Sequence, residues 1–265
     1  MSSTSEPVAA AETRASHIVV EDLTMAFGSR VVMEGLTFTI RRGDIFIIMG
    51  GSGSGKSTLM RHLVGLQRPA AGMIRFCGIS MWEASPDEQA MLQRRLGIMY
   101  QQGALWTSMT LAENVALPLQ TYTRLSPPAI AELAEYKLSL VGLAGFGDFF
   151  PSEISGGMRK RAAIARAMAL DPEVLFLDEP GAGLDPITSR LLDDLILELR
   201  KTLGMTIVIV THELASIFAV GDNSVFLDAE TRTMSACGNP SWLVEHTHDA
   251  KLRAFLTRGA AEPAA

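Results

Sequence analysis

The segment that most constrains the fold of this chain runs from Ile45 to Leu63 and reads IFIIMGGSGSGKSTLMRHL. An apolar stretch of strand length leads into the pattern G-x-x-x-x-G-K-[ST], and a helix is expected from about Lys56 to Leu66. The glycines let the backbone turn so that successive N–H groups face phosphate oxygens. Lys56 can reach the β- and γ-phosphates of a nucleotide, and Ser57 can offer its hydroxyl to Mg²⁺. A flexible Gly/Ser-rich turn is the alternative, but strand, lysine and helix in register favour a phosphate-binding loop.

A second apolar stretch ends in two acids. Residues 174–180 read VLFLDEP, which places carboxylates at the C-terminal end of a buried strand, where the ligands of parallel sheets bind. Asp178 is expected to hold Mg²⁺ through water, and Glu179 to polarise the attacking water as a general base. A strand that ends in solvated acids is common in isolation, so this interpretation depends on the phosphate-binding loop.

Two further features fit phosphate chemistry. His212 directly follows the apolar stretch VIVT and could contact the γ-phosphate or orient the water, although a histidine at a strand end can also be structural. Residues 151–170 read PSEISGGMRKRAAIARAMAL, where a serine and two glycines open a basic, alanine-rich helix. Glycine costs about 1 kcal/mol against alanine inside a helix. A helix start with bare N–H groups, however, is suited to receive an anion, so we interpret this start as more than an ordinary turn.

The rest of the chain is read from its periodicity. Short strands are expected before residue 50, a strand pair at 73–82, and a mostly helical region from Ser85 to about Gly147. Strands alternate with helices again from residue 173, and a hairpin at 223–238 precedes one or two short helices. The economical description is an α/β protein whose parallel sheet core is interrupted by a mostly helical insert.

Composition excludes several classes. The net charge of −6 argues against non-specific binding of nucleic acid. No run approaches the roughly 18–20 apolar residues that span a bilayer, and the first residues lack the features of a secretory signal. Cys77 and Cys237 are expected to be small buried hydrophobes without a disulfide. His246 and His248 lack a third metal ligand and are expected to face solvent.

In their order along the chain, these motifs resemble those of the nucleotide-binding subunits of ABC transporters, over roughly residues 17–245. Gly50 to Thr58 match the Walker A loop, Val174 to Glu179 match Walker B, and His212 matches the switch histidine. Three matches are added by the resemblance: a Q-loop glutamine after Tyr100, a signature ISGGM at 154–158, and a D-loop GLDP at 183–186. Phe27 lies where the family places an aromatic that stacks on adenine.

The resemblance implies ATP and Mg²⁺ as cofactors, and it assigns roles residue by residue. The catalytic residues implied are Lys56, Glu179 and His212, and the metal ligands implied are Ser57, Gln101 and Asp178. The implied nucleotide contacts are Phe27, Gly50, Gly51, Ser52, Gly53, Ser54, Gly55, Lys56, Ser57, Thr58, Gln101, Ser155, Gly156, Gly157 and Asp185.

The family resemblance also explains the glycine-rich helix start. In that family two subunits pack head to tail, which implies that the Ser155-Gly156-Gly157 start of one copy faces the γ-phosphate of ATP bound to the other. One helix terminus contributes only about 0.3–2 kcal/mol, so it cannot hold the dimer together by itself. It can, however, make closure of the dimer depend on the γ-phosphate. Met158 replaces the usual signature glutamine, Ile154 the usual leucine, and Gly51 stands where proline is common. We expect phosphate contact to survive these changes.

The implied fold is an α/β P-loop NTPase of the ABC ATPase type: a RecA-like parallel sheet core, an antiparallel β subdomain and a helical subdomain. We expect a flexible leader at 1–16, the nucleotide-binding domain at 17–253 with its helical subdomain at about 86–156, and a tail at 254–265. The region from Ser241 onward could contact a partner ATPase or a regulator, or be disordered.

The stretch YQQGALWTSMTLAENVALPL, residues 100–119, together with SGGM, resembles the lipid-transport branch of the family, the Mla/Mce type. This implies a homodimer that energises phospholipid transport between inner and outer membranes from the cytoplasmic face of the inner membrane. The partners implied are integral-membrane permease subunits of the MlaE type, with a periplasmic lipid-binding Mce-domain protein and a small cytoplasmic STAS-type subunit as further candidates. Leu105, Trp106 and Met109 are expected to form an apolar surface for a partner helix, unless they pack inside the insert.

Two other functions remain open on the sequence. The same ATPase could serve another cargo, as an importer of amino acids or metals or as a lipoprotein-release system. A soluble ABC clamp in DNA repair or translation is disfavoured, because such proteins usually carry two cassettes or long coiled-coil insertions, and this chain has one cassette and an acidic balance.

Overall fold

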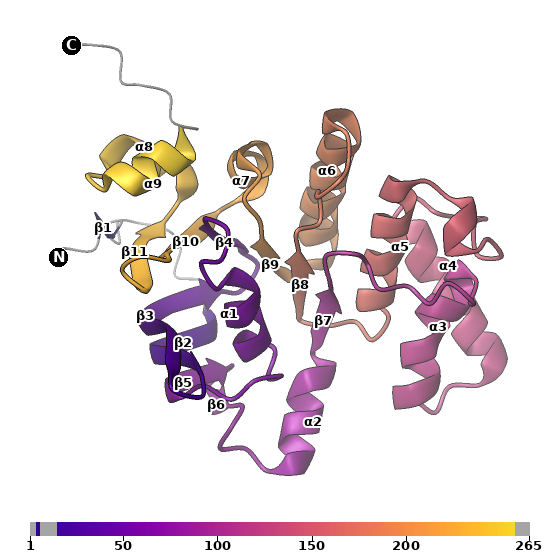
Figure 1. Ribbon diagram of the computed structural model, residues 1–265. Coiled ribbons are helices and arrows are strands. Elements are labelled where there is room, and N and C mark those ends of the chain that lie inside the picture. Colours follow the sequence, from indigo (N-terminus) through magenta and orange to yellow (C-terminus); the bar gives the residue numbers. More distant parts are fainter. Residues whose placement is uncertain (1–3, 6–14, 258–265) are drawn as a thin grey trace. The chain divides into compact units, whose positions relative to one another are not determined.

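The computed structural model, drawn in Figure 1, describes residues 4–5 and 15–257. These residues divide into two compact units. Of the described residues, unit 1 comprises 4–5, 15–92 and 208–257, and unit 2 comprises 93–207. The chain passes between the units within α2 (Pro86–Arg94) and within β9 (Thr206–Val210). The phosphate-binding loop and His212 therefore belong to unit 1, and the other motifs from Gln101 to Asp185 belong to unit 2.

The first part of unit 1 is an antiparallel sheet of order β3-β2-β5-β6. Its strands are β2 (Ser16–Phe27), β3 (Arg30–Arg41), β5 (Ala71–Phe76) and β6 (Ile79–Ser80). Along β3 the residues from Leu36 to Ile40 alternate between buried and more exposed, so the sheet presents one apolar face. A turn after Phe27, which is paired with Arg30, connects β2 to β3. The strand pair expected at 73–82 is confirmed, whereas the expectation of short early strands is wrong: β2 and β3 each have 12 residues, and β3 continues through Gly35.

The second part of unit 1 carries the parallel pairing. Every residue of β4 (Ile45–Gly50) is buried, and β4 runs parallel to β10 (Asn223–Asp228), with Ile48 opposite Val225. The hairpin to β11 (Thr233–Gly238) is confirmed. The helices of this unit, besides the start of α2, are α1 (Lys56–Leu63), α7 (Leu214–Val220), α8 (Pro240–His246) and α9 (Ala250–Leu256). The expected extension of α1 to Leu66 is wrong, because the left-handed Gly65 follows the cap at Val64.

Unit 2 combines a parallel strand pair with the helical region. Strand β7 (Leu96–Met99) runs parallel to β8 (Val174–Asp178), with Met99 opposite Leu177. Its helices, besides the end of α2, are α3 (Leu111–Tyr122), α4 (Pro127–Leu140), the 3₁₀ turn η1 (Pro151–Glu153), α5 (Gly156–Ala167) and α6 (Pro186–Leu203). The sequence interpretation placed no strand in the helical region, so β7 corrects it.

Parts of both termini lie outside the described residues. Of the leader expected at 1–16, Thr4–Ser5 forms a short strand, β1, parallel to β11, and Ser16 begins β2. Residues 1–3 and 6–14 of that leader, and residues 258–265 of the expected tail, are not described. Over residues 4–5 and 15–257, no helix combines the length and the apolar composition needed to cross a membrane.

Candidate functional site

The phosphate-binding loop joins β4 to α1 in unit 1. Gly50 has a φ of +152°, and a Cβ there would lie 2.5 Å from the carbonyl oxygen of Leu227, so that only glycine fits at the end of this strand. Gly55 adopts the left-handed conformation at the N-cap of α1. The backbone therefore turns sharply at both ends of the loop, as a cradle for an anion requires.

The side chains of the loop suit a nucleoside triphosphate. The Lys56 ammonium donates to the carbonyl oxygens of Gly50, at 3.0 Å, and of Gly51, at 2.9 Å, which places it over the loop. The exposed Ser57 lies in the first turn of α1, where the N–H groups lack intrahelical partners. An ammonium, a helix N-terminus and a hydroxyl are the donor set that phosphates with Mg²⁺ require, so these residues fit ATP and its metal ion.

Unit 1 also contains the proposed adenine and switch residues. Phe27 is the last residue of β2, and 51% of its surface is exposed, so its ring is accessible for stacking. His212 is exposed and follows Thr211, whose N–H donates to the carbonyl of Ile48 at 3.2 Å. The structure thus brings His212 beside the strand that ends in the phosphate-binding loop.

Unit 2 brings Gln101 and the two acids to one edge of its strand pair. Because β7 and β8 are parallel and Met99 pairs with Leu177, the residues after both strands share that edge. Asp178 and Glu179 are buried, each with 8% of its surface exposed, whereas Gln101 is exposed. Glu179 has a φ of +48°, a conformation that a non-glycine residue keeps only when its surroundings impose it. A carboxylate held at a strand end is the ligand type that Mg²⁺ prefers, so Asp178 fits the metal assignment.

The signature and D-loop both form helix N-caps in unit 2. Ser155 Oγ accepts from the N–H of Met158 at 3.2 Å and caps α5. Asp185 caps α6: its carboxylate accepts from the Thr188 hydroxyl at 2.5 Å and from the Thr188 N–H at 3.0 Å. These bonds, the hydroxyl first, lower the pKa of the Asp185 carboxyl. Asp185 is therefore an ionised cap at the start of α6.

The structure gives a reason for glycine at position 157 that the sequence did not reveal. A Cβ on Gly157 would lie 2.5 Å from Cγ2 of Thr188, so this glycine is required where α5 packs against α6. At Gly156 the nearest side-chain atom would be Cδ2 of Leu184, at an ordinary 3.7 Å. Packing within the chain is therefore enough to explain Gly157. For Gly156 the proposed role remains close approach to ATP.

The loop proposed to meet a partner is held by a residue that the sequence interpretation missed. Trp106 is 57% exposed, while Leu105 and Met109 are half-buried. The fully buried Asn114 accepts from the Trp106 N–H at 2.8 Å, and its amide group donates to the carbonyls of Trp106, Met109 and Thr110. The sequence signal that could have revealed this role is the position of Asn114 within the mostly apolar stretch LAENVAL. An amide side chain that is buried in a helix needs hydrogen-bond partners.

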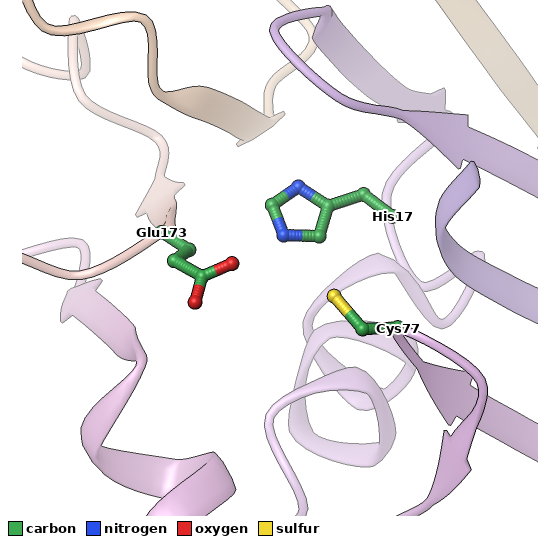
Figure 2. Close-up of side chains that lie close together, drawn as sticks. All are labelled: His17, Cys77 and Glu173. Atoms are coloured by element: carbon green, nitrogen blue, oxygen red, sulfur yellow. The ribbon is translucent and has the colours of Figure 1, made fainter. Parts of the chain in front are cut away.

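Cys77 does not match the expectation of a buried hydrophobe. It is half-buried and its Sγ accepts from Arg42 at 3.1 Å, while its N–H donates to the carbonyl of His17 at 2.8 Å. The side chains of His17 and Cys77 are drawn in Figure 2; His17 lies in β2, and Cys77 directly follows β5. The His17 ring is buried 5.0 Å from the ring of Phe76. Glu173, also drawn there, belongs to unit 2 and pairs with Arg95 at 2.5 Å.

Comparison with protein families gives a match to the model described as "ABC transporter" over residues 33–182. The chain is 42% identical over 206 residues to the "Probable ribonucleotide transport ATP-binding protein mkl" of Mycobacterium tuberculosis, covering 78% of this chain and 57% of that protein. The chain thus spans little more than half the length of the mycobacterial relatives. It is 37% identical over 242 residues to the "Intermembrane phospholipid transport system ATP-binding protein MlaF" of Escherichia coli K12, covering 91% of this chain and 89% of that protein.

Solved structures agree with these matches. A structure of cbiO1 from Clostridium perfringens, part of the ABC transporter complex cbiONQ, has a TM-score of 0.80 at 28% identity and covers 88% of this chain and 92% of its own. The ATP-binding cassette MJ0796, solved as a dimer in a post-hydrolysis state bound to ADP and Pi, has a TM-score of 0.74 at 28% identity. It covers 84% of this chain and 98% of its own.

Proposed function

The chain belongs to the ABC transporter family, and we propose that it is the ATP-hydrolysing subunit of a transporter that moves phospholipid between the inner and outer membranes. Phospholipid is proposed as the cargo because the chain matches the phospholipid transport protein MlaF over about nine-tenths of both chains. The match to the mycobacterial protein named for ribonucleotide transport is higher in identity but covers only 57% of that protein. We therefore give phospholipid precedence as the cargo.

In this proposal, unit 1 binds the nucleotide and unit 2 supplies the acids for hydrolysis. The loop from Gly50 to Thr58 holds the phosphates through its N–H groups, and Lys56 neutralises their charge. Ser57, Asp178 and Gln101 hold Mg²⁺, which neutralises charge on the phosphate oxygens when bound. Glu179 accepts a proton from the attacking water, and His212 orients that water or contacts the γ-phosphate.

We propose that two copies act together, with Ser155 and Gly156 of one copy facing the ATP held by the other. The dimeric cassette MJ0796 supports this assembly. The exposed Trp106, with Leu105 and Met109, then meets a permease subunit at the cytoplasmic face of the inner membrane. A periplasmic Mce-domain protein and a STAS-type subunit are further proposed partners.

Replacing Glu179 with glutamine tests the hydrolytic role. We expect Glu179→Gln to bind ATP as the wild type does and to reduce turnover by about 10²-fold or more, because the general base is lost. Glu198→Gln, an equal charge change at an exposed position of α6, is the matched control and should keep full activity. A Glu179→Gln protein with normal turnover would refute the assignment.

The cargo is tested by purifying the tagged chain from detergent-solubilised native membranes and identifying retained proteins and lipids by mass spectrometry. A polytopic permease with bound phospholipid supports the proposal. A permease that arrives with a binding protein for amino acids, metals or ribonucleotides would overturn the cargo and leave the ATPase assignment intact.

A further inference from the structure

Two cations of α5 hold the backbone of the loop that follows β7. Lys160 Nζ donates to the carbonyl oxygen of Gln101, and the Arg166 guanidinium donates to the carbonyls of Gly103, at 2.8 Å, and Ala104, at 2.7 Å. Three carbonyls within residues 101–104 are thus fixed to one helix. All of these residues lie in unit 2.

Lys160 reaches a second motif as well. Its ammonium also donates to the carbonyl oxygen of Glu179, at 3.4 Å, and only 9% of the residue is exposed. A buried ammonium is costly unless acceptors surround it, and a lysine offers three donors in a compact head. These two acceptors belong to the main chain, so Lys160 fixes the path of the backbone at both motifs.

The conformation of Glu179 makes this bond consequential. A φ of +48° is unfavourable for a glutamate and persists only where the surroundings fix it. The same carbonyl that Lys160 holds also accepts from the N–H of Ala182, at 3.2 Å, in the turn that follows the strand. The direction of the Glu179 side chain depends on this turn, because the Cα–Cβ direction is set by the backbone.

We propose that Lys160 is a positioning residue that couples the main chain at Gln101 to the main chain at Glu179. A partner that displaces the loop at 101–104 changes the geometry of Glu179 through the Lys160 ammonium group. Arg166 keeps the loop attached to α5 while the loop moves. The inference rests on the proposed function, since it takes Glu179 to be the residue that activates water.

Replacing Lys160 with methionine removes the charge and keeps the length of the side chain. We expect Lys160→Met to lower kcat roughly 10- to 100-fold, as a misplacement of about 1 Å does. KM for ATP should stay within about threefold, because the phosphate-binding residues are unchanged. The thermal midpoint should change little, because the cost of burying the cation is removed, the Glu179 carbonyl keeps its bond from the Ala182 N–H, and Gln101 is exposed to water. Lys160→Arg keeps two donors and should recover most of kcat.

Arg161→Met is the matched control. Arg161 is the next residue of α5, carries the same charge and donates to the carbonyl of Val141 at 3.3 Å, away from both motifs. Its replacement should leave kcat unchanged. If Lys160→Met and Arg161→Met lower kcat equally, or if Lys160→Met keeps wild-type kcat, the proposal is wrong.

Amide hydrogen exchange of the full-length variants tests the coupling without ATP turnover. In Lys160→Met, exchange should rise at Gly103 and Ala182, whose N–H groups close the turns at Tyr100 and Glu179, and stay unchanged along α5. A rise confined to α5 would show that Lys160 only stabilises its helix and would overturn the proposal. A wild-type protein that hydrolyses no ATP would refute the proposed function, whereas the exchange result would still decide the role of Lys160.

Discussion

Gly157→Ala adds a single methyl group at the contact between α5 and α6. The new Cβ would lie 2.5 Å from Cγ2 of Thr188, far inside van der Waals contact, and Thr188 is held by the bond from its hydroxyl to Asp185. Because Oγ1 and Cγ2 share the same Cβ, turning Cγ2 of Thr188 away from α5 also breaks the bond from its hydroxyl to Asp185. The clash must be relieved by moving one helix against the other.

The magnitude follows from two opposing terms. Overpacking of a tight contact costs about 1–3 kcal/mol, and alanine regains up to about 1 kcal/mol over glycine in a helix. The net loss is about 1 kcal/mol of unfolding free energy, which corresponds to roughly 2–4 °C in the thermal midpoint of a chain of this size. Thr188→Ser removes Cγ2 but keeps the hydroxyl that donates to Asp185, the cap of α6, so the double variant should lose the clash and keep the gain from alanine.

Thermal unfolding of the wild type, both single variants and the double variant completes a double-mutant cycle. We expect a coupling energy of about 1–3 kcal/mol, with the double variant at least as stable as Thr188→Ser alone. If Gly157→Ala is as stable as the wild type, or if the two single effects simply add, the methyl group does not clash with Cγ2 of Thr188. ATP turnover of the stable double variant then tests separately whether Gly157 also approaches the nucleotide.

Two further predictions concern buried polar side chains. Burial lowers the pKa of His62 below 6.5, against the Gln67 carbonyl, which favours the protonated ring. The unfolded chain therefore takes up this proton first, so stability is full above about pH 6.5 and falls as the pH drops below that value. His62→Gln should lose less stability than the wild type between pH 7.5 and 5.5, and parallel curves of thermal midpoint against pH would contradict this. Asn114→Leu should cost about 2–4 kcal/mol, because it removes the partner of the Trp106 N–H and of the Met109 carbonyl, and one of two donors to the carbonyls of Trp106 and Thr110. The emission of Trp106 in a background without the other tryptophans should shift on this substitution, and an unchanged spectrum with an unchanged thermal midpoint would show that Asn114 does not hold the loop.

The motifs proposed to contact the nucleotide could be recognised because each is contiguous in sequence. The loop from Gly50 to Thr58 is bounded by its own strand and helix, so local pattern contains both the conformation and the donor set. Asp178 and Glu179 follow a fully buried strand in the same way. Strand β7 could not be predicted, since four residues including Gly97 carry little pattern of their own. It forms because β8, distant in sequence, supplies its pairing partner.

The residues that hold these motifs in place were hidden for a different physical reason. Lys160 and Arg166 look like solvated positions of a basic helix, and only the path of the loop at 101–104 makes Lys160 a buried donor and Arg166 a half-buried one. Gly157 looks like a phosphate contact, and only the side chain of Thr188 on another helix gives it a packing role. Such contacts join segments far apart in sequence, so one sequence by itself does not contain them.

Helix α5 therefore carries two roles that single substitutions can separate. Gly157 lies against α6, where a methyl group costs packing energy, so Gly157→Ala should lower the thermal midpoint. Lys160 holds two main-chain carbonyls, so Lys160→Met should lower kcat with little change in the thermal midpoint. Opposite signatures from two residues one turn apart cannot come from a general loosening of the helix, because loosening would lower the midpoint in both variants. If both variants lost stability alike, α5 would be a scaffold for the signature and nothing more.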